Sequence, residues 1–227
     1  MRPCTLRIAS AEGTIKATSL DAALVEHAPW CGTAPGRTSN PHQASNDVID
    51  DLGRLLVEHA LLEGDFLLRS GKRSSWYLDK YRFETRPDLL RALGERLAGV
   101  AREVEPDTVR FAGPALGAVA LAASASMASG LPFIIVRGET KEYGTANRIE
   151  GPYDGGDLVC LLEDVVTSGG ALAESVSALR DAGLVVRNAV CVVDREEGGA
   201  DALARLGVRL RSLYRASDLL AGRSPAG

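Results

Sequence analysis

The sequence predicts an α/β fold in which a parallel twisted sheet is flanked by helices. Beyond residue 108, short apolar segments alternate with longer segments of helical length, and the segments at 158–162 and 189–193 contain only hydrophobic residues. Strands of this kind are buried on both faces, and their alternation with helices produces a parallel sheet covered on either side. The chain has 227 residues, 45% hydrophobic and 25% charged, which is enough for one domain with a sizeable core.

The first 44 residues differ from the rest of the chain. Four prolines interrupt a stretch rich in Thr, Ser and Ala with weak periodicity, which predicts a poorly ordered N-terminal extension over 1–44. Residues 45–227 are expected to form the folded domain, with a small hairpin-containing part over 45–85 and an α/β core over 86–215.

Two helices and a hairpin are predicted at the start of this domain. Ser45 or Asn46 can cap the first helix, whose apolar residues follow helical spacing: Val48, Leu52, Leu55 and Leu56. Apolar runs at 66–68 and 76–78 predict two strands around a polar turn. Thr85 is expected to cap the second helix, which has an apolar stripe of Leu89, Leu93, Leu97 and Val100.

The strand–helix alternation then continues to residue 213. Strands are predicted at 108–112, 133–136, 158–162, 189–193 and 208–213, and helices at 116–129, 171–182 and 200–206. Gly130 and Gly183 mark the ends of the first two of these helices, because glycine readily adopts the left-handed conformation that closes a helix.

Composition and charge narrow the class of protein. A net charge of −4 argues against a general nucleic-acid or membrane binder, and no apolar stretch reaches the ~18 residues of a transmembrane helix. Charged residues interrupt any signal-peptide core near the N-terminus. The four cysteines have no CxxC spacing, which argues against a zinc site or a disulfide framework. A cytoplasmic enzyme without a nucleic-acid or membrane partner is therefore expected.

The sharpest functional signal is the thirteen-residue string from Val159 to Ala171. An apolar strand leads directly to two acids, Glu163 and Asp164, and a small-residue turn then opens a helix. Hydroxyls, glycines with accessible N–H groups and the positive end of a helix suit a phosphate, whereas the acids suit the two hydroxyls of a ribose. The string therefore predicts a ribose-phosphate site, although an isolated acid and glycine pair would more often only shape a turn.

This string resembles the phosphoribosyl-diphosphate signature of type I phosphoribosyltransferases, and it contains neither the Gly-Lys-Ser/Thr element of a P-loop nor GxGxxG. The resemblance implies that family's fold, a parallel twisted sheet flanked by helices with a small N-terminal hairpin, or hood. It also implies that the two acids hold the ribose hydroxyls and that the turn holds the 5'-phosphate. The positions that carry over are Glu163, Asp164, Val165, Val166, Thr167, Ser168, Gly169, Gly170 and Ala171.

Further segments between about 56 and 195 resemble orotate phosphoribosyltransferases in particular. The hairpin 66–79 is similar to the hood over the base, where Arg69 is expected to contact phosphoribosyl diphosphate and Tyr77 to contact orotate. Arg195 is expected to bind the orotate carboxylate with two hydrogen bonds, together with Thr167. Without the resemblance, a basic surface hairpin and an ion pair between Arg195 and a neighbouring glutamate would be the simpler interpretations.

The segment 136–145 resembles the loop that closes over diphosphate in this family, often from the neighbouring subunit. The resemblance implies a homodimer in which Arg137, Lys141 and Tyr143 contact the donor. Lys141, Arg137 and Asp164 are the expected catalytic residues, with Lys141 as a candidate proton donor. The chain departs from the family's pattern at four places. In the loop, Gly138 stands where many members have lysine, and Tyr143 stands where many have histidine. Arg69 stands where lysine is common, and the segment 113–117 lacks a lysine that some members carry.

The reaction that the resemblance implies is the magnesium-dependent transfer of a phosphoribosyl group to orotate. It gives orotidine 5'-phosphate and diphosphate, a step of pyrimidine (UMP) biosynthesis. Mg²⁺ is expected to bind mainly through the substrate diphosphate, without a protein metal site. Two alternatives stay open. One is an enzyme of this fold that acts on another base. Arg195 and the basic hairpin argue against that alternative. The other is a non-catalytic regulator that binds phosphoribosyl diphosphate, an alternative that Gly138 leaves open.

Overall fold

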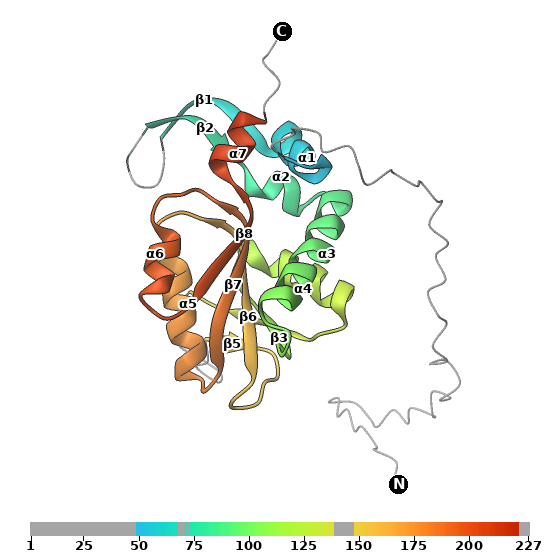
Figure 1. Ribbon diagram of the computed structural model, residues 1–227, viewed down its shortest axis with the longest axis vertical. Helices are drawn as coiled ribbons and strands as arrows, with labels where there is room; N and C mark the ends of the chain where they lie inside the picture. The colour runs from blue at the N-terminus through green and yellow to red at the C-terminus, as the bar shows by residue number, and fades with distance from the viewer. Residues whose placement is uncertain (1–48, 68–70, 72, 139–147, 223–227) are drawn as a thin grey trace, which may run out of the picture. The chain divides into compact units, whose positions relative to one another are not determined.

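The structure is a computed structural model that describes residues 49–67, 71, 73–138 and 148–222. Within these residues, β1 (Leu61–Leu67) and β2 (Arg73–Leu78) form an antiparallel hairpin, and six further strands form one sheet in the order β5-β4-β3-β6-β7-β8 (Figure 1). The predicted extension 1–44 lies outside the described residues.

The six-stranded sheet is parallel except at one edge. β5 pairs antiparallel with β4, and each of the other neighbouring pairs is parallel. The strands are β3 (Arg110–Pro114), β4 (Phe133–Val136), β5 (Ile149–Glu150), β6 (Leu158–Val166), β7 (Val185–Asp194) and β8 (Arg209–Arg215). The predicted parallel sheet is confirmed. β5 was not predicted, because two residues are too few to carry a periodic signal.

Helices cover both faces of this sheet. In Figure 1, α3 and α4 lie on one side of the strands and α5 and α6 on the other. The helices are α1 (Asp51–Ala60), α2 (Lys80–Glu84), α3 (Pro87–Val104), α4 (Gly117–Ser129), α5 (Gly170–Asp181), α6 (Gly199–Ala204) and α7 (Ala216–Ala221). The short helices α2 and α7 were not predicted from the sequence, because neither is long enough to show an amphipathic pattern.

Alternate residues of β6 divide the core into two clusters. Val159 and Leu161 pack in the cluster that contains the apolar residues of α5, whereas Cys160 and Leu162 pack in the cluster that contains those of α3 and α4. All four side chains are fully buried. Because successive strand residues point to opposite faces, a strand buried on both sides must be apolar at every position, and this explains the unbroken apolar run.

The starts of two helices differ from the sequence predictions. α1 begins at Asp51 and is capped by Asp50, whose carboxylate accepts a hydrogen bond from the Gly53 N–H at 2.9 Å. Ser45 and Asn46 lie outside the described residues. Thr85 does not cap α3: it ends α2, where its hydroxyl donates to the Tyr81 carbonyl at 2.5 Å, and α3 begins after it with a proline in its first turn.

β6 is longer than predicted, and this changes where the two acids lie. The apolar run suggested that the strand ends at residue 162, but the ladder with β7 continues to Val166. Glu163 and Asp164 are therefore strand residues and do not belong to the turn. The sequence did not predict this end of the strand, because buried strands are expected to be apolar and carboxylates interrupt the hydrophobic pattern.

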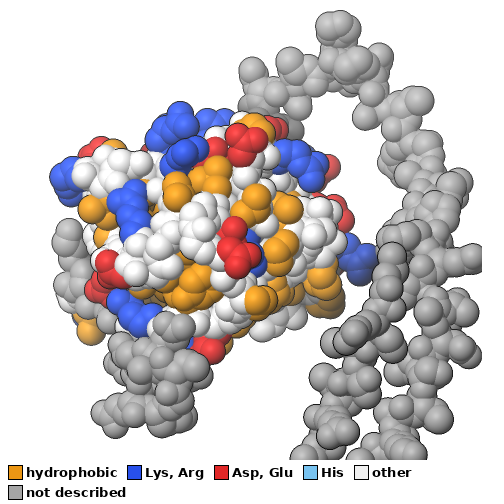
Figure 2. Space-filling view, turned by 90° about the horizontal axis from the view of Figure 1, so that it is seen from below, with side chains coloured by type: hydrophobic (Ala, Val, Ile, Leu, Met, Phe, Trp, Pro, Cys, Tyr) orange, Lys and Arg blue, Asp and Glu red, His pale blue; other side chains and the backbone are white. Residues whose placement is uncertain are grey.

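Figure 2 shows the face of the molecule that is seen after a turn of 90° from the view of Figure 1. Basic, acidic and hydrophobic side chains are interspersed on this face, without a continuous patch of one charge. Among the described helices, none combines the length and apolarity needed to cross a bilayer.

Candidate active site

The chain reverses its direction across the sheet between β3 and β6. From β3 it moves outward through α4 to β4 and β5, then returns to β6 beside β3 and continues through α5 to β7 and β8. In open α/β sheets, ligands bind outside the carboxyl ends of the strands at such a switch point. The turns after β3 and β6 meet there, and the turn after β6 is the one that the sequence singled out.

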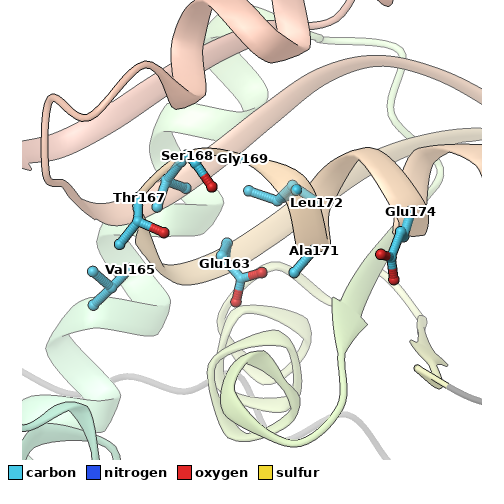
Figure 3. A pocket seen from close by; sticks show the side chains of 10 residues that line it. Glu163, Val165, Thr167, Ser168, Gly169, Ala171, Leu172 and Glu174 are labelled. Atoms are coloured by element: carbon cyan, nitrogen blue, oxygen red, sulfur yellow. The ribbon is translucent and has the colours of Figure 1, made fainter. Parts of the chain in front are cut away.

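A cavity of about 480 Å³ lies at the carboxyl end of β6 (Figure 3). Figure 3 shows the Glu163 carboxylate and the hydroxyls of Thr167 and Ser168 around the start of α5. The volume is typical of a site for a small organic ligand. The lining residues are Glu163, Val165, Val166, Thr167, Ser168, Gly169, Gly170, Ala171, Leu172 and Glu174.

The turn between β6 and α5 requires glycine at one position. Gly169 has φ +80°, a left-handed conformation, and a Cβ there would lie 3.0 Å from the carbonyl oxygen of Gly199. α5 begins at the next residue, so its first N–H groups open toward the cavity without partners inside the helix. Free N–H groups and the positive end of a helix dipole together favour a phosphate at this turn.

The two acids of β6 lie on opposite faces of the sheet. Glu163 lines the cavity beside α5, and Asp164 contacts a side chain of α2 on the other face. Both are nearly inaccessible, with 8% and 3% of their surfaces exposed. Burial, together with the negative charge of Asp164, raises the pKa of Glu163 to about 8. The two carboxylates still lie close enough to interact, and their joint contact with one ribose stays a prediction.

Sequence reasoning missed the partner of Asp164. Lys80, the first residue of α2, donates from Nζ to Asp164 Oδ2 at 2.6 Å, across a separation of 84 positions in the chain. Glu84, one turn later on α2, is 5% exposed, and burial and the charge of Asp164 raise its pKa to about 8. No spacing rule connects residues so far apart, so only the folded chain could reveal this cluster.

Arg195 lies beside the turn between β6 and α5. Its backbone N–H donates to the Val166 carbonyl at 2.8 Å, and its guanidinium carbon stands 4.3 Å from the ring centre of Trp76 on β2. Arg195 Nε also donates to Glu197 Oε1 at 2.9 Å, which is the ion pair that the simpler interpretation foresaw. A guanidinium has five donors, so this bond leaves room for a carboxylate ligand.

The two neighbouring aromatic residues of β2 are positioned differently. Trp76 packs against the core cluster and under Arg195, while Tyr77 is 41% exposed and lies near Phe66, with 5.6 Å between the ring centres. Neighbouring residues of a strand face opposite sides, so Tyr77 is not brought to Arg195. Its contact with orotate stays a prediction.

Of the remaining predicted site residues, only Arg137 falls within the described part of the chain. It follows β4, at the same edge of the sheet as the turns after β3 and β6, and its Nη1 donates to Glu150 Oε1 at 3.3 Å. Arg69, Lys141 and Tyr143 lie outside the described residues.

The described residues offer a limited set of metal ligands. Among them, no group of three or more His, Cys, Asp or Glu side chains is placed to hold a metal ion. The carboxylates at the carboxyl end of β6 are those of Glu163, which lines the cavity, and Asp164, which accepts a hydrogen bond from Lys80. Such a donor set fits a magnesium ion that arrives with a diphosphate and is held largely by it.

Known proteins resemble this chain over most of the folded region, although no protein-family model matches it. The chain is 48% identical over 157 residues to the orotate phosphoribosyltransferase of Methanocella arvoryzae, and the match covers 69% of this chain and 88% of that protein. The crystal structure of orotate phosphoribosyltransferase from Aeropyrum pernix has a TM-score of 0.69 at 34% identity and covers 75% of this chain and 96% of that one.

A third relative was solved with a ligand. The orotate phosphoribosyltransferase of Mycobacterium tuberculosis, in complex with 5-phospho-α-D-ribosyl 1-diphosphate, has a TM-score of 0.61 at 30% identity and covers 74% of this chain and 96% of that one. The matched relatives agree with the cavity, because each carries the name of an enzyme that acts on a ribose phosphate.

Proposed function

The chain belongs to the orotate phosphoribosyltransferase family, and from this premise we propose which residues carry out its reaction. As a member it is a pentosyltransferase, which converts orotate and 5-phosphoribosyl 1-diphosphate to orotidine 5'-phosphate and diphosphate. The observation that carries the assignment of the site is the cavity at the carboxyl end of β6, which combines an acid, two hydroxyls and the start of α5.

The donor's 5'-phosphate occupies the turn from Thr167 to Gly170. The close backbone approach at Gly169 and the unpaired N–H groups at the start of α5 support this position. Glu163 accepts hydrogen bonds from the ribose hydroxyls, since its carboxylate faces the cavity. Asp164 approaches the same ribose from the side of α2, where Lys80 holds it.

Orotate lies between the turn and the hood. Arg195 binds its carboxylate, and stacking on Trp76 together with the bond to Glu197 holds the guanidinium in one orientation. Thr167 and Tyr77 complete the contacts to the base. A purine has no carboxylate for Arg195, which favours orotate over other bases.

The reaction is a displacement at C1 of the ribose. N1 of orotate releases its proton to solvent and forms a bond to C1, while the bond from C1 to the diphosphate oxygen breaks and the electron pair leaves with diphosphate. Positive charge grows on the ribose and negative charge on the leaving group, so catalysis depends on orientation and on charges placed in advance. Arg137 and Lys141 neutralise the departing diphosphate, and Lys141 supplies a proton to it.

Magnesium is held mainly by the diphosphate of the donor, and when bound it neutralises part of the leaving group's charge. Two copies of the chain associate, and the loop that contains Lys141 closes over the site of the neighbouring subunit. Closure excludes water, which would otherwise attack C1 in place of orotate.

Consumption of orotate tests this function directly. The purified chain, given orotate, phosphoribosyl diphosphate and magnesium, is expected to form orotidine 5'-phosphate and diphosphate in equal amounts, and chelation of magnesium is expected to stop the reaction. Turnover of adenine, hypoxanthine or uracil in place of orotate would contradict the base assignment. Binding of the donor without consumption of any base would instead indicate a regulator.

A further inference from the structure

A lysine from outside the signature reaches into the turn that follows β3. Lys80 begins α2, directly after the hairpin, and its Nζ lies 2.6 Å from Asp164 Oδ2. The Lys80 side chain is 32% exposed, whereas that of Asp164 is 4% exposed. Lys80 therefore holds a buried carboxylate, while part of its own side chain is open to solvent.

The turn after β3 makes room for this ion pair by lacking a side chain. A Cβ on Gly117 would lie 1.8 Å from Asp164 Oδ2 and 2.5 Å from Lys80 Nζ, so any other residue would displace the pair. Gly117 begins α4 at the carboxyl end of β3, beside β6. The Lys80 ammonium thus occupies the space that a side chain at Gly117 would otherwise fill.

The charges around Lys80 show why a cation is needed there. Glu84, Glu163 and Asp164 are three buried or nearly buried acids, and the charges of these acids act on one another. Burial by itself would lower the pKa of Lys80, but the hydrogen bond to Asp164 and the charge of that carboxylate raise it, so the ammonium stays protonated. A polyanionic donor that approached the Asp164 carboxylate without a cation would be repelled.

We propose that Lys80 is a catalytic residue that contacts the donor, with its ammonium bonded to Asp164 on one side and to the diphosphate oxygens on the other. An ammonium has three donors, and Asp164 uses one of them. Lys80 thereby supplies, from α2, a cation to the turn of β3 that has none of its own between Gly113 and Gly117. This inference rests on the proposed function, because it requires phosphoribosyl diphosphate as the ligand.

Calorimetric binding tests the contact without relying on orotate. Lys80→Met keeps most of the side-chain volume and removes the charge. With magnesium present, we expect it to weaken binding of phosphoribosyl diphosphate at least tenfold and to weaken binding of ribose 5-phosphate, which lacks the diphosphate, less than threefold. Turnover should fall on the order of 10²-fold, as for the loss of one donor to a transition-state charge. Lys80→Arg should recover part of both losses.

Arg82→Met is the matched control. Arg82 lies on the same helix, is 54% exposed and pairs with Asp79 at 3.5 Å, so its replacement removes one positive charge from α2 outside the site. Binding of both ligands and turnover should stay within twofold of the wild type. Thermal unfolding of all three variants separates a loss of the ligand contact from a loss of the fold.

Three results would overturn the proposal. Equal weakening of both ligands by Lys80→Met would mean that Lys80 only holds Asp164 in place. Unchanged donor affinity would mean that the ammonium does not reach the diphosphate. If Lys80→Met does not fold, Lys80→Arg carries the test. A Lys80→Arg variant that keeps wild-type donor affinity and turnover, and is weakened only in binding ribose 5-phosphate, would contradict the contact. Wild-type protein that binds the donor and does not consume orotate would count against the proposed function, not against this contact.

Discussion

The guanidinium carbon of Arg195 lies 4.3 Å from the ring centre of Trp76, so the end of β7 and the second strand of the hood meet over the candidate base site. Arg195 is 9% exposed in its side chain, and the bond from its Nε to Glu197 supports it from a second direction. A cation held between an aromatic face and a carboxylate has little rotational freedom. Arg195 is therefore positioned before orotate arrives.

Loss of the Trp76 ring should weaken orotate binding selectively. Trp76→Leu keeps an apolar side chain and removes the cation–π contact, so we expect KM for orotate to rise about five- to tenfold, which corresponds to roughly 1 kcal/mol. KM for phosphoribosyl diphosphate should change less than twofold. Arg195→Leu should raise KM for orotate thirtyfold or more, since an ion pair to the carboxylate is worth roughly 2–3 kcal/mol. Equal rises for both substrates in Trp76→Leu would indicate a general loss of the fold.

The left-handed turn at Gly169 should be intolerant of a side chain. In Gly169→Ala, the φ of +80° and the 3.0 Å contact with the Gly199 carbonyl both oppose a Cβ, and we expect a loss of roughly 1–2 kcal/mol of unfolding free energy and weaker binding of ribose 5-phosphate. Gly170→Ala is the control for stability, because a Cβ there meets no atom within 4 Å. Thermal unfolding and calorimetry measure the two effects. A Gly169→Ala variant as stable as Gly170→Ala would refute the requirement for glycine.

Lys141 should matter for turnover more than for affinity. Lys141→Ala removes a cation that acts on the leaving diphosphate, and we expect kcat to fall on the order of 10²–10³-fold while the Kd for phosphoribosyl diphosphate rises much less. Steady-state kinetics and calorimetry on the same preparation give both quantities. Near-normal turnover would exclude the role assigned to Lys141.

Mixed subunits can show whether the loop of one copy serves the site of the other. Lys141→Ala and Arg195→Leu are each expected to be nearly inactive. If the loop is shared, a refolded equal mixture contains heterodimers with one intact site, and activity should return to on the order of one quarter of the wild-type value. If each copy uses its own loop, every site keeps one defect and the mixture should stay inactive.

The buried carboxyl of Glu84 should make stability depend on pH. Burial and the charge of Asp164 raise its pKa in the folded protein from an ordinary 4.5 to about 8, so the folded state holds the proton more tightly than the unfolded state. The stabilisation is complete below about pH 4.5 and is lost as pH rises toward 8. Glu84→Gln does not titrate, so its advantage over the wild type should grow from pH 5 to pH 9, reaching roughly 1–3 kcal/mol, or several degrees in Tm.

A matched substitution on the surface shows whether this effect belongs to the buried site. Glu103 is exposed on α3, and Glu103→Gln makes the same change of charge. Its Tm should follow that of the wild type at each pH. If Glu103→Gln and Glu84→Gln gave the same pH profile, the effect would come from net charge and not from burial.

The sequence by itself determined the fold class and identified the turn that we propose binds the donor. Unbroken apolar strands can only be buried on both faces, so the runs at 158–162 and 189–193 required a covered parallel sheet, which the structure contains. The turn from Thr167 to Gly170 was predictable because small residues and hydroxyls between a strand and a helix are a local pattern, and local patterns are complete within a few residues.

Only the tertiary structure decided which residues meet at that site. It continued β6 through Glu163 and Asp164, so that both acids are strand residues, and it brought Lys80 to Asp164 across 84 positions of the chain. These contacts arise when distant elements pack on the two faces of one sheet. The free energy of these contacts depends on burial and on the distances between charges in space. The spacing of residues along the sequence does not give these quantities.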